Sequence, residues 1–332
     1  MTIDIRTATI QPRRQTYANV ARRIGADKPA SRYEESMFDM QATGEFHYRP
    51  TWAPEYELFD ARRTVIVLDD WHVLRDPRQF YYGTYTITRS RMMEASEKAF
   101  AYAERRGSLS AVSDQWTELA RHYLLPLRHY EWGANMNNCN ITDIGFGSAI
   151  TQAAMFATMD RLGIAQIVSR IGLLMDGGTG TSLTAAKQDW LEHPSWQGLR
   201  RAMEDLFVEP DWFQVFVAQN FALDGILYPL VYRAFDDEGQ KQGGGAISPL
   251  TEFMLDWFDE TSRWVDAVMA AAAKESEANA LHLSDWAASW TARARQALEP
   301  LATEVLHDRE GEVLDGIVDD LAARCRKIGL RA

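Results

Sequence analysis

The stretch Asp211-Trp-Phe-Gln-Val-Phe-Val-Ala-Gln-Asn-Phe-Ala-Leu-Asp-Gly-Ile-Leu227 carries the pattern that decides the fold. Its apolar side chains recur at three- and four-residue steps, which is the period of an α-helix with one buried side. The pattern predicts a helix that Asp211 opens and that continues to about Phe235, with a kink expected at Pro229. The residues expected on its buried side are Phe213, Phe216, Val217, Phe221 and Leu227.

The same helical period fills the chain from about Ser90, and the alternation typical of strands is scarce. A second kink is expected at Pro126, inside one of the predicted helices. The pattern indicates an all-α body with one core over roughly residues 90–330. The predicted helices span residues 91–106, 113–138, 143–175, 182–191, 195–207, 211–235, 248–276, 283–297, 300–307 and 311–328.

The N-terminal region has a different composition, from which we predict two parts: an extended arm over residues 1–89 and a helical domain over residues 90–332. The arm has too little periodic structure to fold as an independent core, but its aromatic run Phe46–Trp52 is unlike plain disorder. Either the arm is ordered on a partner protein or it wraps on its own bundle. Its prolines are Pro12, Pro29, Pro50, Pro54 and Pro77.

Composition excludes several classes of protein. A formal net charge of −12 argues against a nucleic-acid partner, because phosphate binding needs a basic surface. The only cysteines are Cys139 and Cys325, which suggest no disulfide framework and fit a reducing compartment. The N-terminus does not read as a signal peptide, and no stretch is expected to reach the 18 or more apolar residues of a membrane span. We therefore expect a cytoplasmic protein with no membrane partner.

Two glutamates stand where a carboxylate-bridged diiron bundle would place metal ligands. Such bundles use a Glu-x-x-His pair on each of two helices, because three residues are almost one helical turn and both side chains then face one metal. The chain instead has Glu131-Trp-Gly-Ala134 and Glu260-Thr-Ser-Arg263. Ala134 offers no ligand atom, and Arg263 would place a permanent positive charge where a cation must sit. We predict no metal ligands and no catalytic or cofactor-binding residues in this chain.

The seven histidines offer no symmetric pair of such motifs, because only His307 has a glutamate, Glu304, three residues before it. One alternative remains open: Glu118 and His122 are four residues apart, and His129 is seven further on. If Pro126 does not rotate the second half of the helix, one face carries all three. This face is either a mononuclear metal site or an ordinary polar face.

Buried charge is expected at Glu131, Asp224 and Glu260, because they fall on the most apolar predicted helices. Carboxylates inside a bundle need cations or hydrogen bonds. One hypothesis is that Arg263 occupies the lost metal position and neutralises them. The alternative is that these residues lie on the bundle surface.

The chain resembles the β subunit of the hydroxylase component of bacterial multicomponent monooxygenases, and most of all that of phenol hydroxylase. The similar stretches run along almost the whole chain, and they are weakest at about residues 235–250 and in much of 270–320. They are Arg14-Gln-Thr-Tyr-Ala-Asn19, Asp27-Lys-Pro-Ala-Ser-Arg32, Phe46-His-Tyr-Arg-Pro50, Asp76-Pro-Arg-Gln-Phe-Tyr-Tyr-Gly83, Pro126-Leu-Arg-His129, Gly133-Ala-Asn-Met-Asn-Asn138, Met159-Asp-Arg-Leu-Gly163, Ser169-Arg-Ile-Gly-Leu-Leu174, Trp196-Gln-Gly-Leu-Arg-Arg201 and Lys327-Ile-Gly-Leu330.

The resemblance implies a ferritin-like helix bundle paired with a homologous α subunit that holds the diiron site. It also implies a small γ subunit, an α2β2γ2 hydroxylase, a regulatory protein, and a reductase with FAD and a 2Fe-2S cluster. The complex would use NADH and O2 to hydroxylate phenol-type aromatics. The motifs at Glu131/Ala134 and Glu260/Arg263 would correspond to the α subunit's Glu-x-x-His motifs, and the arm would embrace the α subunit.

Three hypotheses about function follow. The first is a non-catalytic structural β subunit of a phenol or aromatic monooxygenase. The second is a β subunit of a related toluene, alkene or methane monooxygenase, since the resemblance implies that substrate choice resides in α. The third is an enzyme with its own mononuclear metal site at Glu118, His122 and His129.

Overall fold

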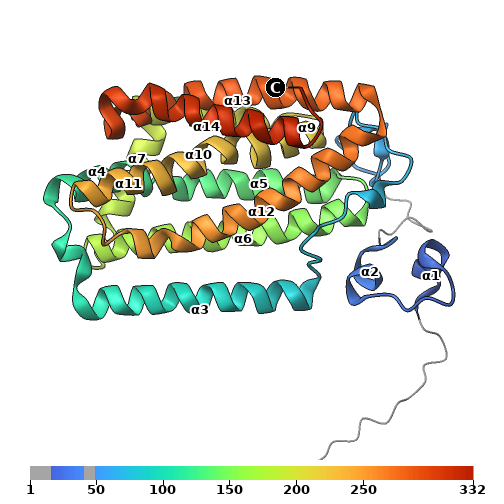
Figure 1. Ribbon diagram of the computed structural model, residues 1–332, viewed down its shortest axis with the longest axis horizontal. Helices are drawn as coiled ribbons and strands as arrows, with labels where there is room; N and C mark the ends of the chain where they lie inside the picture. Colours follow the sequence, from blue (N-terminus) through green and yellow to red (C-terminus); the bar gives the residue numbers. More distant parts are fainter. Residues whose placement is uncertain (1–15, 41–48, 332) are drawn as a thin grey trace, which may run out of the picture.

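A computed structural model describes residues 16–40 and 49–331, and it consists of long helices packed side by side (Figure 1). No strand occurs in these two ranges, so the prediction of an all-α protein is confirmed. The long helices are α3 (Tyr82–Arg106), α4 (Asp114–Leu124), α5 (Leu127–Ile144), α6 (Ser148–Met175), α7 (Thr181–Glu192), α8 (Pro194–Leu206), α12 (Ser248–Glu275), α13 (Glu277–Leu306) and α14 (Glu310–Lys327). Short 3-10 turns are η1 (Ala61–Arg63), η2 (Trp71–Val73), η3 (Ser108–Ala111) and η6 (His307–Arg309).

The predicted helix from Asp211 is one continuous helical run that alternates between α and π geometry. Asp211 caps it by accepting hydrogen bonds from the backbone of Phe213 and Gln214. Pro229 lies inside the run at the end of an α segment. The segments in order are α9 (Trp212–Phe216), the π segment η4 (Val217–Leu223), α10 (Asp224–Pro229), the π segment η5 (Leu230–Phe235) and α11 (Asp236–Lys241).

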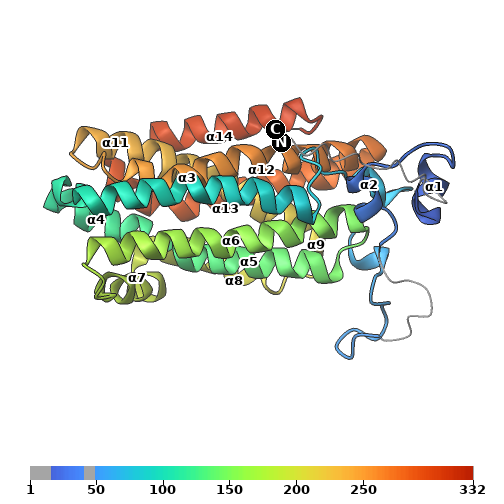
Figure 2. The same cartoon turned by 90° about the horizontal axis from the view of Figure 1, so that it is seen from below.

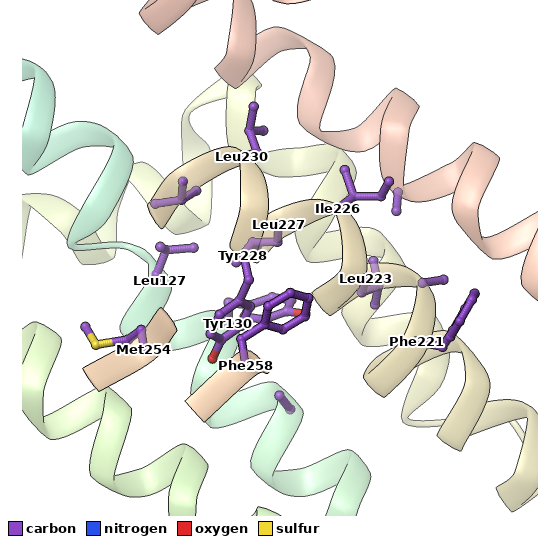
Figure 3. Close-up of a cluster of buried hydrophobic side chains, with 14 of the residues drawn as sticks. Leu127, Tyr130, Phe221, Leu223, Ile226, Leu227, Tyr228, Leu230, Met254 and Phe258 are labelled. Carbon is purple, nitrogen blue, oxygen red and sulfur yellow. The ribbon is translucent and has the colours of Figure 1, made fainter. Parts of the chain in front are cut away.

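This run corrects one expectation. The helix Trp212–Lys241 is long and apolar enough to cross a membrane by length and composition, so the prediction that no stretch reaches that threshold is wrong. Its most apolar window is 94% buried inside the protein, which is how the core helix of a bundle behaves. Figure 3 shows its side chains, among them Tyr228 and Leu227, converging on Tyr130 and Phe258 from neighbouring helices.

Two predicted helix boundaries also differ. The expected single helix over residues 113–138 is two helices, and Pro126 is the N-cap residue of α5. The expected helices 283–297 and 300–307 are one helix, α13, with Pro300 inside it. Proline removes one backbone hydrogen bond from a helix, but the buried flanking residues Leu298 and Leu301 hold both halves of α13 against the core.

Helices α5 and α6 form the closest pair of the bundle and run side by side in both views (Figures 1 and 2). Their register is fixed where the Asn135 side chain donates to the Thr158 carbonyl at 2.9 Å. Residues 131 and 161 therefore face one another across the pair, and this pairing positions the site described below.

The described part of the N-terminal region closes one end of the bundle. It contains the short helices α1 (Ala18–Ile24) and α2 (Arg32–Met37), which lie beyond the end of α6 (Figures 1 and 2). Trp71 packs on Trp212 and Phe146, with ring centroids 5.8 and 5.6 Å away. The backbone N–H and carbonyl of Val67 both pair with the side chain of Asn279 on α13. The described part of the arm therefore packs on its own bundle, and the contact of the arm with a partner subunit stays a prediction.

The predicted boundary between residues 89 and 90 stays a prediction. Helix α3 begins at Tyr82, upstream of that boundary, and packs along α12 in the bundle. Residues 1–15 and 41–48, which include the start of the aromatic run Phe46–Trp52 and of two similar stretches, lie outside the described residues.

Candidate functional site

The centre of the bundle holds a fully buried arginine, Arg161, on α6. Its guanidinium donates to Glu131 Oε2 on α5 at 3.1 Å and to Asp224 Oδ2 on α10. The exposed fractions of these three side chains are 0, 0 and 2%. Carboxylates buried to this degree must be paired, and one planar guanidinium serves both because its fork presents several donors at fixed angles.

Neutral side chains complete the hydrogen bonds of these carboxylates, and we call the whole group the inner network. Tyr228 donates to Glu131 Oε1 at 2.8 Å, and Tyr130 donates to Asp224 Oδ1 at 2.6 Å. Gln219 donates to the same Asp224 oxygen at 3.2 Å. The members are Glu131, Arg161, Asp224, Tyr130, Tyr228, Gln219 and Asn220.

The π segment η4 explains how Gln219 reaches Asp224. Five residues separate them, and on a regular α-helix they would point about 140° apart. A π turn bonds residue i to residue i+5, which brings the two side chains onto one side. Such turns are frequent at functional sites of proteins. Here the π segment directs three polar side chains inward at the level of Arg161: Gln219, Asn220 and Asp224.

Burial sets the protonation of the inner network. Loss of solvent raises the pKa of Glu131 to about 7, although Arg161 opposes the shift. Burial also raises the pKa values of Tyr130 and Tyr228, so both phenols stay neutral donors. Two carboxylates face one guanidinium, and the raised pKa of Glu131 lets a proton relieve the surplus negative charge.

A second group, the outer network, lies beside the first and is less buried. Arg89 on α3 makes a bidentate pair with Asp160, both distances being 2.8 Å, and also contacts Glu260 on α12 at 3.1 Å. Arg78, from the arm, pairs with Asp76 at 2.9 Å and reaches Glu260 at 3.5 Å. The members are Asp76, Arg78, Arg89, Asp160 and Glu260, with Tyr85 and Trp257 donating to Asp160.

The predicted positions do not come together at one site. Glu131 belongs to the inner network, whereas Glu260 belongs to the outer one. Ala134 is buried without a polar side chain. Arg263 is exposed, so the hypothesis that it neutralises the buried carboxylates is wrong. It lies one turn from Glu260 but faces solvent, and Arg161 is the cation between Glu131 and Asp224.

The alternative metal site is not assembled either. The Glu118 side chain is 72% exposed and pairs with Arg121. His129 stacks against Trp190 with ring centroids 6.1 Å apart, and burial lowers its pKa to about 4. His122 points elsewhere, toward Asp189 and Glu304. A structural role for Glu118 and His129 therefore fits better than the mononuclear site.

The interior does not fit a diiron centre. Such a centre takes its ligands from carboxylates and two histidines. None of the described residues that contact Arg161 is a histidine, and the guanidinium itself fills the space between Glu131 and Asp224. Two ferrous or ferric ions in that space would face a permanent positive charge.

Comparison with known proteins identifies the family. The family model of methane, phenol and alkene hydroxylases matches residues 52–276. The chain belongs to this family. The oxygenase component DmpL of phenol 2-monooxygenase from Pseudomonas sp. (strain CF600) is 48% identical over 332 residues, with 100% of this chain and 99% of the relative covered. MhpL, the corresponding component from Acinetobacter pittii (strain PHEA-2), is 42% identical over 331 residues, with 100% and 98% covered.

Solved structures of the family agree with the fold. A chain in the crystal structure of xenon-pressurised phenol hydroxylase from Pseudomonas sp. OX1 superimposes with a TM-score of 0.93 at 42% identity, covering 99% of both chains. Toluene 4-monooxygenase gives a TM-score of 0.76 at 20% identity, over 89% of this chain and 98% of the other, and so supports the fold alone. The predicted ferritin-like bundle and the resemblance to hydroxylase β subunits, nearest to the phenol branch, are confirmed.

Within this hydroxylase fold, sequence reasoning missed Arg161 and Asp160. The signal was available: Asp160-Arg161 is an adjacent pair of opposite charges near the middle of α6, a helix whose other buried residues are apolar or small. Consecutive helical residues point about 100° apart. Adjacent buried charges on α6 therefore had to meet two different sets of partners.

Proposed function

We propose that this chain is the non-catalytic, structural β subunit of a cytoplasmic diiron phenol or aromatic monooxygenase hydroxylase. It would support the iron-bearing helices of the α subunit and help to assemble the hydroxylase dimer. The observation that carries this proposal is the position of Arg161, whose guanidinium takes the place between buried carboxylates that a diiron centre would need. The relatives named as monooxygenase oxygenase components support the assignment to such a complex.

In this proposal the chemistry is done by other subunits. Diiron in the α subunit would activate O2, and the reductase, through FAD and a 2Fe-2S cluster, would deliver electrons from NADH. A γ subunit would complete an α2β2γ2 hydroxylase, and a regulatory protein would join it. The residues of this chain would hold the bundle rigid: the inner network locks α5, α6 and α10 together through charge-assisted hydrogen bonds.

An exposed apolar face supports contact with the α subunit, and we call it the α5–α6 face. Its side chains point away from the core of this chain on two adjacent helices. Trp and Met are enriched in protein interfaces, and apolar patches of this kind mark partner surfaces. The members and their exposed fractions are Trp132 58%, Met136 46%, Met155 42%, Met159 38% and Leu162 38%.

A matched pair of variants tests this assignment. Leu162 on α6 and Leu281 on α13 are exposed to 38 and 37%, so Leu162→Asp and Leu281→Asp change the same area and charge. We expect Leu162→Asp to weaken association with the α subunit by about tenfold or more, and Leu281→Asp to leave it unchanged. Co-purification and sedimentation of the mixed subunits measure the effect. Equal behaviour of the two variants would remove the α5–α6 face as the contact.

Iron analysis tests the non-catalytic role. The full chain prepared without the α subunit should carry no stoichiometric iron, whereas the assembled hydroxylase should carry it. Iron that stays with this chain in a complex with iron-free α would overturn the proposal. An activity screen of the assembled complex against phenol, toluene, alkenes and methane then decides whether the complex is a phenol hydroxylase or a related toluene, alkene or methane monooxygenase.

A further inference from the structure

A second polar cluster lies away from both networks, where α4, α13 and the junction of α7 and α8 meet. One ring nitrogen of His122, one of His193 and one carboxylate oxygen of Glu304 all lie within 4.8 Å of one another. All three residues are half-buried, so solvent and small ions can reach them. The three come from helices far apart in sequence, and only the fold brings them together.

The ligand atoms of this cluster lie close enough together to bind one metal ion. His122 Nε2 faces Glu304 Oε2 at 2.8 Å, and the rings of His122 and His193 lie edge to face with centroids 4.4 Å apart. Pro194 follows His193 at the first position of α8, which fixes where α8 begins and so where His193 is held. Two imidazoles and one carboxylate form a donor set that Zn²⁺ takes in proteins, with water in the fourth position.

Neighbouring residues hold two of these ligands in place. Asp189 Oδ2 contacts His122 Nδ1 at 2.9 Å, which keeps a proton on Nδ1 and directs the Nε2 lone pair toward the cluster. Ser195 donates to Glu304 Oε1 and leaves Oε2 facing His122. A histidine ligand almost always donates its other N–H to a carboxylate, a carbonyl or water, as His122 does here.

The charge of the cluster also favours a cation. Asp189 and Glu304 both face His122, and in the described part of the chain neither carboxylate pairs with a lysine or an arginine. A divalent ion held by this cluster would face the Glu304 carboxylate and one ring nitrogen from each histidine.

We propose that His122, His193 and Glu304 bind one divalent transition-metal ion, for which Zn²⁺ is the best fit, with Asp189 as a positioning residue. The site shares no residue with the inner or outer network, and its two imidazoles and one carboxylate differ chemically from the carboxylate-rich ligand set of a diiron centre. The ion would tie α4, α13 and the α7–α8 junction together. His193 Nδ1 accepts only a long hydrogen bond from the Ser195 N–H, at 3.4 Å, so this contact holds the ring weakly.

Zinc titration of conservative variants tests the site. Glu304→Gln keeps an acceptor for Ser195 and removes the carboxylate, and His193→Asn keeps a residue that caps α8 well. Asp189→Asn removes only the group that orients His122. The matched control is His282→Gln, which removes an exposed histidine of α13. Affinity for Zn²⁺ is measured by competition with a chelating dye on the full-length chain, assembled with its partner subunits where it needs them to stay soluble.

We expect wild type and His282→Gln to bind one more equivalent of zinc than Glu304→Gln and His193→Asn do in the same preparation. Asp189→Asn should weaken binding by about 10- to 100-fold. The X-ray absorption spectrum should show only nitrogen and oxygen ligands at about 2.0–2.2 Å. The proposal is overturned if zinc uptake is the same in wild type, Glu304→Gln and His193→Asn. The measurement does not use monooxygenase activity, so its outcome is independent of the proposed function.

Discussion

The inner and outer networks start from adjacent residues of one helix and solve the problem of buried charge in different ways. Arg161 is fully buried and satisfies its carboxylates with phenols and amides from three neighbouring segments. Arg89 is 8% exposed, and its partner Glu260 is 17% exposed and shared with Arg78 of the arm. The inner network is therefore fully buried, and all its members lie within the bundle. The outer network instead connects the arm to the bundle.

Trp257 on α12 couples the two networks. Its indole N–H donates to Asp160 Oδ2 at 2.9 Å, and its ring lies 4.4 Å from the guanidinium carbon of Arg161. A cation over the face of tryptophan is attracted by the ring, more strongly where water is excluded. The contribution of each network to stability should therefore depend on how far its charged side chains are exposed to solvent, and not on how many ion pairs it contains.

The largest expected effect is the loss of Arg161. Arg161→Met removes the only guanidinium facing Asp224 among the described residues and leaves that carboxylate buried without a cation. Removal of one partner from a buried pair costs about 3–5 kcal/mol. We expect a chain that no longer folds stably or assembles, measured by thermal unfolding and by yield of the hydroxylase complex.

The double variant Arg161→Met/Asp224→Asn keeps this prediction testable if the single variant does not fold. The amide introduced by Asp224→Asn would still accept from Tyr130, and a buried pair replaced by neutral groups is often near neutral in stability. The double variant should therefore be more stable than Arg161→Met alone. A single variant as stable as wild type would show that the buried carboxylates of the inner network do not need Arg161.

The next effect concerns the proton of Glu131. The folded chain holds this proton up to about pH 7, while the ordinary pKa is 4.5. Between these values the folded state binds more protons than the unfolded state, so stability falls as pH rises through this window. At about 1.4 kcal/mol per pKa unit, the contribution is at most roughly 3 to 4 kcal/mol. Below pH 4.5 this penalty is absent, and above pH 7 it is complete.

Glu131→Gln isolates that contribution. The amide still accepts from Tyr228 and does not titrate, so the stability difference between variant and wild type should grow in favour of the variant from about pH 5 to about pH 7.5. Denaturant unfolding at a series of pH values measures the difference. A constant difference across the window would mean that Glu131 stays ionised beside Arg161.

A smaller effect is expected in the outer network. Arg89→Met leaves Asp160 with two donors, Tyr85 and Trp257, and leaves Glu260 in contact with Arg78. The remaining partners and the partial exposure limit the cost to about 1–3 kcal/mol. Thermal unfolding should show a shift clearly smaller than that of Arg161→Met. A shift larger than that of Arg161→Met would mean that the outer network contributes more to stability than the inner network does.

The sequence predicts the helices far better than the site, for a physical reason. Apolar periodicity is a local property, so the helices at 182–191 and 248–276 are found almost at their observed bounds. The π segments and the uninterrupted α13 depend on tertiary packing, which overrides local proline signals. Pairing of charges depends on which helices become neighbours, and periodicity alone does not encode that.

Asp224 and Arg263 show what apolar periodicity can predict about buried charges and what it cannot. Asp224 shares a face with apolar residues of its own helix, and its burial was predictable from that periodicity. Its partner Arg161 lies on another helix, and no spacing rule connects the two. Arg263 follows Glu260 by one turn, but proximity along a helix does not specify which side chain turns inward.

The smallest expected effect is therefore the most direct comparison of the two arginines. Arg263→Met removes the same kind of side chain as Arg161→Met, but from an exposed position on α12. Substitutions of exposed residues away from special features usually change stability by less than about 0.5 kcal/mol. Thermal unfolding of the two variants under one condition should give a large loss for Arg161→Met and almost none for Arg263→Met. Similar losses of stability in the two variants would mean that Arg263 also neutralises buried carboxylates, because the loss of an exposed side chain cannot destabilise the protein to that extent.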